Sequence, residues 1–153
     1  MHRVLSRLRR RLAVALGCLV GLFVLMQLVP YGRRHTNPRV IVEPAWNSPR
    51  TRELAVRACF DCHSNETKWP WYADVAPFSW VIERDVIDAR SVMNFSEWTH
   101  AHELATEAGP AVIRRDMPPL KYRLIHTDAD LSEDDKIELA RGLNATFGGT
   151  GRM

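Results

Sequence analysis

The most informative stretch of this sequence is Ala58–Ser64, ACFDCHS, which contains the pattern C-x-x-C-H. Cys59 and Cys62 are three positions apart, so on a helical turn their thiols point to the same side. From there the two thiols can add to the two vinyl groups of a haem, and His63 brings an imidazole to the iron. The pattern is the sequence signal for covalent attachment of a c-type haem.

Three other interpretations of these residues are a redox dithiol, a zinc site and a chance match. A redox dithiol belongs near a βαβ pattern, and no run of β-branched residues flanks Cys59. Structural zinc takes four ligands, usually as two spaced pairs, and here a single Cys pair exists. The third cysteine, Cys18, lies in an apolar segment, and His63 is too close to Cys62 to bind the same tetrahedral ion comfortably. The spacing therefore favours haem.

The charge of the chain is unevenly distributed. The 153 residues carry a formal net charge of +3, but residues 1–30 hold five arginines and no acidic residue. The remainder has 16 basic against 18 acidic residues. The folded part therefore lacks the basic surface that nucleic-acid binding requires. With two of the three cysteines assigned to haem, no disulfide framework is expected.

The N-terminal segment predicts a membrane anchor. Residues 12–29 form an apolar run broken only by Gln27, and as a helix they would extend about 27 Å, close to the thickness of a bilayer's hydrocarbon core. The preceding arginines predict a cytoplasmic N-terminus. A cleaved signal peptide is the alternative, although QLVPY (27–31), at the end of the apolar run, contains no small-x-small cleavage site.

The rest of the chain predicts an all-α domain. We expect a tail and anchor over 1–30, a proline-containing linker over 31–46 and a haem-binding domain over 47–148. Asn47-Ser48-Pro49 is a helix start, and Ser132 with Asp135 is another. Apolar spacing predicts further helices over about 80–92 and from Asn94 or Ser96 to a break at Gly109-Pro110.

Several stretches resemble a known family. They are HTNP (35–38), NSPRTREL (47–54), RACFDCHSNETKWPWY (57–72) and RDMPP (115–119). Together they resemble the small bacterial haem-binding domain family related to single-haem cytochromes c, over roughly residues 30–147. The resemblance implies a cytochrome c-like all-α fold with one covalently attached haem c, behind a single transmembrane helix. It implies less about the physiological role.

Met117 is the predicted sixth ligand of the iron, with His63 as the fifth. Pro118 and Pro119 fix an extended segment that would hold the methionine in place, and a thioether is a standard partner to histidine in electron-transfer cytochromes. The resemblance places its MPP at the same position. The alternatives are a core methionine that fills a gap, a site left open, or a histidine ligand. The candidate histidines are His100, His102 and His126.

Five aromatic residues lie within residues 69–80, interrupted by two prolines. We expect an ordered loop along the haem edge, with a plain aromatic core as the alternative. Asn65 is expected on the solvated surface.

These features predict one-electron transfer with an unidentified redox partner protein. The haem domain would lie in the periplasm, at the outer face of a bacterial inner membrane. A haem-based sensor or ligand binder with an open sixth position is the first alternative. A peroxidase-like enzyme is the second, although no distal acid–base pair is recognisable.

Overall fold

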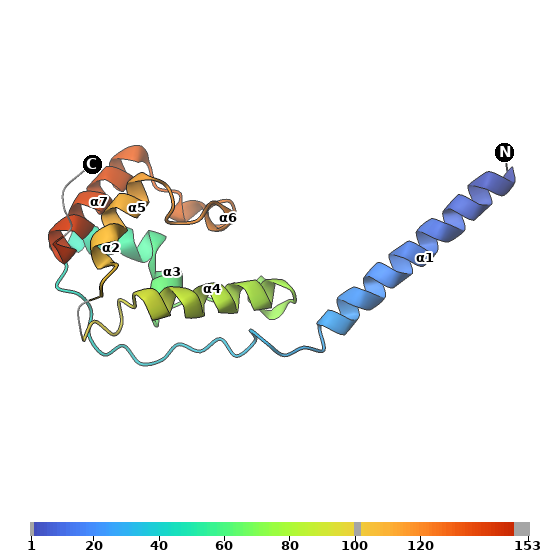
Figure 1. The fold of residues 1–153 in the computed structure, drawn as a ribbon, viewed down its shortest axis with the longest axis horizontal. Coiled ribbons are helices and arrows are strands. Elements are labelled where there is room, and N and C mark those ends of the chain that lie inside the picture. Colours follow the sequence, from blue (N-terminus) through green and yellow to red (C-terminus); the bar gives the residue numbers. More distant parts are fainter. Residues whose placement is uncertain (1, 100–101, 149–153) are drawn as a thin grey trace. The chain divides into compact units, whose positions relative to one another are not determined.

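The computed structural model describes residues 2–99 and 102–148. Within these residues the fold is all-α, as predicted, and strand-like pairing is limited to an isolated parallel bridge between Val42 and Glu97 (Figure 1). The α-helices are α1 (His2–Met26), α2 (Pro49–Ala58), α3 (Phe60–His63), α4 (Phe78–Val92), α5 (Ala108–Ile113), α6 (Leu120–Arg123) and α7 (Glu133–Phe147). Short 3₁₀ helices are η1 (Trp71–Asp74), η2 (Ala105–Glu107) and η3 (Thr127–Ala129).

The chain divides into two compact units. The first contains residues 1–35 and 70–84, and the second contains residues 36–69 and 85–153. In the first unit the side chain of Gln27 donates to the carbonyl of Ala76 at 2.9 Å and accepts from its N–H at 3.0 Å, which fixes the chain just after α1. The aromatic residues of this unit contact each other, since Tyr72 packs edge-on against both Trp71 and Phe78.

The expected membrane-spanning helix is not found. Across residues 2–99 and 102–148, every helix is too short or too polar to cross a bilayer. The apolar run over 12–29 is helical only as far as Met26, where α1 ends. The 15 helical residues after Arg11 extend about 22 Å, against roughly 30 Å of hydrocarbon.

The second unit is built on α2, α5 and α7 (Figure 1). The last helix, α7, packs against both α2 and α5. Both predicted helix starts are confirmed: the Ser48 hydroxyl accepts from the N–H of Thr51, and the Ser132 hydroxyl accepts from the N–H of Asp135. Gly148, at φ 71°, ends α7 in the left-handed conformation that glycine adopts without strain. The buried core includes Leu54, Ala55, Phe60, Phe95, Val112, Leu131, Leu139, Ala140 and Leu143.

The helix predicted from Asn94 or Ser96 to Gly109-Pro110 is wrong over its first part. Among the described residues, helical structure begins only at Ala105, in η2, and α5 continues through Gly109 and Pro110 instead of breaking there. Asn94 and Ser96 bond locally, because the Asn94 side-chain oxygen accepts from the Ser96 N–H at 3.0 Å. The Ser96 carbonyl accepts from the N–H groups of Ile41 and Val42, in a distant segment. These bonds compete with the helical pattern, so the described residues from 93 to 104 are irregular.

Gly142 allows α7 to approach α2 closely. A Cβ atom at this position would lie 2.0 Å from the Thr51 Oγ1 atom and 2.6 Å from its Cγ2 atom. Thr51 is itself 2 % exposed and β-branched, so its side chain has little room to turn away. The glycine is therefore required by packing between the two helices.

We expect Gly142→Ala to lower the free energy of unfolding by about 1–3 kcal/mol, because the added methyl group overpacks this crossing. Urea denaturation of the purified variant measures the change. In a Thr51→Ala background the same substitution should cost less, since two of the three nearest contact atoms are gone. An equal cost in both backgrounds would contradict the packing explanation.

Candidate functional site

A largely apolar cavity of about 460 Å³ lies in the second unit. Its size is within the range of cavities that hold cofactors and other small molecules. Its walls come from five parts of the chain: α2 and α3, the second half of α4 with the residues after it, η2 and α5, the segment from Met117 to Tyr122, and α7. The lining includes Ala58, Cys59, Cys62, His63, Asp85, Ala89, Val92, Met93, Phe95, Leu104, Ala108, Val112, Met117, Pro118, Lys121, Tyr122 and Leu143.

The C-x-x-C-H pattern occupies a helical turn of its own. α2 ends at Ala58, Cys59 breaks the helix with φ −126° and ψ −34°, and α3 begins at Phe60. The N–H of His63 donates to the Cys59 carbonyl at 2.8 Å, which closes the turn. The motif therefore follows the predicted helix as a separate turn, and Cys59, Cys62 and His63 all line the cavity.

Residues 93–95 hold His63 through both its side chain and its backbone. The His63 Nδ1–H donates to the Met93 carbonyl at 3.0 Å, and the Phe95 N–H donates to the His63 carbonyl at 2.7 Å. With its Nδ1 proton committed to this carbonyl, the ring keeps the lone pair on Nε2. Burial lowers the pKa of His63, so the imidazole is neutral at pH 7 and able to bind a metal.

Asn65 secures the chain where it leaves the motif, and its expected place on the solvated surface is wrong. The residue is 3 % exposed. Its side-chain oxygen accepts from the Asn94 side chain, and its amide group donates to Glu97 at 2.8 Å. The Asn65 N–H donates to the Ser96 hydroxyl at 2.9 Å. This network attaches the end of the motif to the segment that holds His63.

Burial makes both motif thiols weak acids. It raises the pKa of Cys59 from 9.0 to about 12 and, together with the nearby Asp61 carboxylate, that of Cys62 to about 11. In the folded haem-free protein both thiols are therefore protonated at neutral pH.

The stability of the haem-free protein should consequently fall with rising pH. The folded state holds the thiol protons more tightly than the unfolded state. The resulting contribution to the free energy of unfolding is fully present below pH 9 and is lost as the pH rises through 11 to 12. Urea denaturation between pH 8 and about 11 should give a steeper fall than in the Cys59→Ala/Cys62→Ala variant. If the free energy of unfolding falls equally with pH in the two proteins, the pKa values of the thiols are not raised by burial.

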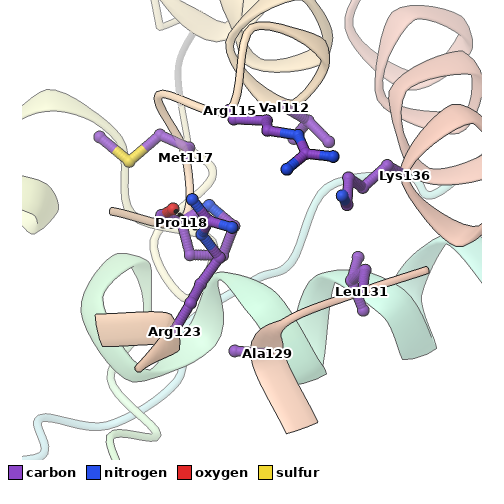
Figure 2. A pocket seen from close by; sticks show the side chains of 8 residues that line it. All are labelled: Val112, Arg115, Met117, Pro118, Arg123, Ala129, Leu131 and Lys136. Carbon is purple, nitrogen blue, oxygen red and sulfur yellow. Dashed lines mark hydrogen bonds between the residues drawn. The ribbon is translucent and has the colours of Figure 1, made fainter. Parts of the chain in front are cut away.

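Met117 reaches the same cavity as the motif. Its N–H donates to the Ala111 carbonyl at 3.3 Å, so its backbone lies against α5. Figure 2 shows its thioether turned away from the basic side chains of Arg115, Arg123 and Lys136, which surround a much smaller cavity of about 10 Å³. Met117 lines both cavities, and its side chain is 41 % exposed. A group bound in the larger cavity would contact it.

The candidate histidines are placed differently from Met117. His102 packs against the Trp98 ring with centroids 4.4 Å apart, and His126 stacks on Tyr122 at 4.1 Å. Neither is among the residues that line the cavity, and His100 lies outside the described residues. The structure brings Cys59, Cys62, His63 and Met117 to one cavity and leaves the described candidate histidines outside it.

Sequence analysis missed several polar residues of this site. The Tyr122 hydroxyl donates to the Asp61 carboxylate at 2.5 Å, and Lys121 pairs with Asp85 at 2.6 Å. Both contacts join the segment after Met117 to distant helices. In the sequence, Lys121 and Tyr122 are marked only by their position just after the two prolines. That position does not predict the residues that they contact.

The residues present fit a haem. The pattern supplies two thiols on one turn and a neutral imidazole whose Nε2 lone pair is available. The thioether of Met117 provides a second soft ligand in the same cavity. The remaining walls are mainly apolar, as a flat apolar macrocycle requires, and Lys121 is among the polar residues that line them.

Comparison with known proteins agrees with this chemistry. A family model described as a haem-binding domain matches residues 21–145. No match was found among the curated proteins or the solved structures.

Proposed function

Because this chain belongs to the family of haem-binding domains, we propose that it carries one covalently attached haem c and exchanges single electrons with a partner protein. The observation that carries the proposal is the cavity that Cys59, Cys62, His63 and Met117 line together. When bound, the haem supplies an iron that takes up and releases one electron. The following steps concern what the chain's own residues contribute.

The two thiols provide attachment and orientation. Addition of each S–H across a haem vinyl group would form a C–S bond and place the hydrogen on the neighbouring carbon, so that no external oxidant would be consumed. Cys59 and Cys62 are protonated before the reaction, because burial raises the pKa of both thiols. Cys59 and Cys62 line the cavity together with His63, so attachment would fix the macrocycle relative to that imidazole.

His63 is the proposed proximal ligand. Its Nδ1–H bond to the Met93 carbonyl fixes the tautomer and the ring orientation, and it raises the basicity of Nε2. Ring orientation is further restricted by the buried Phe95, whose ring centroid lies 6.1 Å from that of the imidazole. A ligand held in this way needs little rearrangement when the charge of the iron changes.

Met117 is the proposed distal ligand. The rival methionine in the cavity wall, Met93, is bonded through its carbonyl to His63, which places it beside the proximal imidazole. A second ligand to the iron would have to come from another wall of the cavity. The segment of Met117 supplies one, and its thioether would stabilise the reduced iron.

A second candidate function is haem-based sensing or ligand binding with an open sixth position. The observation in its favour is the exposure of Met117, 41 %, which leaves its side chain less restrained than His63. In that case the cavity would admit a small ligand to the iron. The two functions differ in whether the iron is already six-coordinate.

We expect the haem-loaded protein to give a reversible one-electron couple in a potentiometric titration. Its oxidised form should show the weak near-infrared sulfur-to-iron band, and its reduced form should bind carbon monoxide slowly, because both axial positions are filled. A five-coordinate reduced spectrum, immediate binding of carbon monoxide and the absence of the band would instead support the sensing function.

A further inference from the structure

The segment that carries Met117 is anchored by the buried Pro118, but the residues that follow make few apolar contacts. It continues into α6, which has only four residues, Leu120–Arg123. Leu120, Leu124 and Ile125 are 61 %, 72 % and 60 % exposed, so these side chains contribute little burial. Polar contacts must therefore contribute much of the stability that keeps this segment in the cavity wall.

The contact best placed to do so joins Tyr122 to Asp61. The Tyr122 hydroxyl donates to Asp61 Oδ2 at 2.5 Å, a short bond of the kind that a phenol forms with a carboxylate. Both residues are half-buried, and Tyr122 lines the cavity. Two ion pairs also hold this region. Lys121 pairs with Asp85, with side chains 59 % and 40 % exposed, and Arg123 pairs with Asp130, whose side chain is 55 % exposed. Exposed ion pairs contribute little to stability.

Asp61 is a rigid partner for this bond. Its Oδ1 accepts from the Lys68 N–H at 3.0 Å, and its carbonyl accepts from the Thr67 hydroxyl at 2.8 Å. It lies between the two cysteines of the attachment pattern. The bond from Tyr122 therefore connects the segment of the proposed distal ligand directly to the turn that carries the proximal ligand.

We propose that Tyr122 and Asp61 form a positioning pair that keeps Met117 on the iron. This inference rests on the proposed function, in which Met117 is the distal ligand. Neither side chain acts on the iron itself. When the hydrogen bond is absent, the segment from Met117 to Arg123 leaves the cavity more often, and the thioether leaves with it. The pair thereby sets how rarely the sixth position opens.

Tyr122→Phe in the haem-loaded protein isolates the hydroxyl group, because the Phe ring retains the stacking on His126 that the Tyr ring makes at 4.1 Å. Carbon monoxide binds the reduced iron only after the methionine leaves, so the binding rate reports this departure. We expect that rate to increase about tenfold, the factor expected for a lost hydrogen bond to a charged group. The near-infrared band of the oxidised variant should also be lost at a lower temperature.

Matched variants separate this role from a general loss of stability. Tyr31→Phe makes the same chemical change in the first unit and should leave the carbon monoxide rate as in the wild type. In an Asp61→Ala background, Tyr122→Phe should have a smaller effect on the carbon monoxide rate than in the wild type, since the bond to Asp61 is already lost. If Asp61→Ala fails to mature with haem, the single Tyr122→Phe variant remains decisive.

The outcomes distinguish this inference from the proposed function. If the wild type shows the band and Tyr122→Phe binds carbon monoxide at the wild-type rate, the positioning pair is refuted while Met117 stays the ligand. If the wild type lacks the band and binds carbon monoxide at once, Met117 is not the ligand, and both proposals are overturned.

Discussion

Replacing Met117 with alanine is expected to lower the reduction potential of the haem-loaded protein and to open its iron to carbon monoxide. A thioether favours the ferrous state, so its loss stabilises the oxidised form. We expect a decrease on the order of 0.1 V, a fraction of the roughly 0.8 V over which axial ligands set haem potentials. The near-infrared sulfur-to-iron band should disappear, and carbon monoxide should bind rapidly.

Met93→Ala is the discriminating variant, because Met93 is the other methionine of the cavity wall. Its side chain is 8 % exposed, so truncation should cost about 2–5 kcal/mol of stability. The band should remain, since the His63 bond uses the backbone carbonyl of residue 93 and not its sulfur. Loss of the band in Met93→Ala and its retention in Met117→Ala would reverse the ligand assignment.

The second large effect is expected from Cys59→Ala combined with Cys62→Ala. Without either thiol no thioether bond can form, so denatured protein should retain no haem. His63 and the apolar walls remain, and haem added to the folded variant should bind reversibly. Each single variant should retain haem through its one remaining thiol. Haem that stays with the denatured double variant would mean that another residue forms the bond.

Local chemistry explains what could be predicted from the sequence. Ser48 and Ser132 start their helices as expected, because each hydroxyl accepts from an N–H group three residues away. The C-x-x-C-H pattern likewise carries its own geometry within one turn. In all three places the deciding partners lie within a few positions, so the pattern alone determines the arrangement.

Distant partners explain what could not be predicted. Ser96 accepts from Ile41 and Val42, which overrides the helical spacing around it. The Tyr122–Asp61 bond joins residues 61 positions apart, so no local pattern indicates it. The span predicted from apolar composition fails for a related reason, since composition does not reveal that α1 ends at Met26.

We propose above all that this chain holds its haem covalently through Cys59 and Cys62. The direct measurement is the intact mass of the denatured wild-type chain after expression with a c-type maturation system. We predict one population heavier by the mass of a single haem, and a proteolytic fragment containing ACFDCHS that carries the whole increase. A denatured chain at its unmodified mass, with the haem free in solution, would contradict the account.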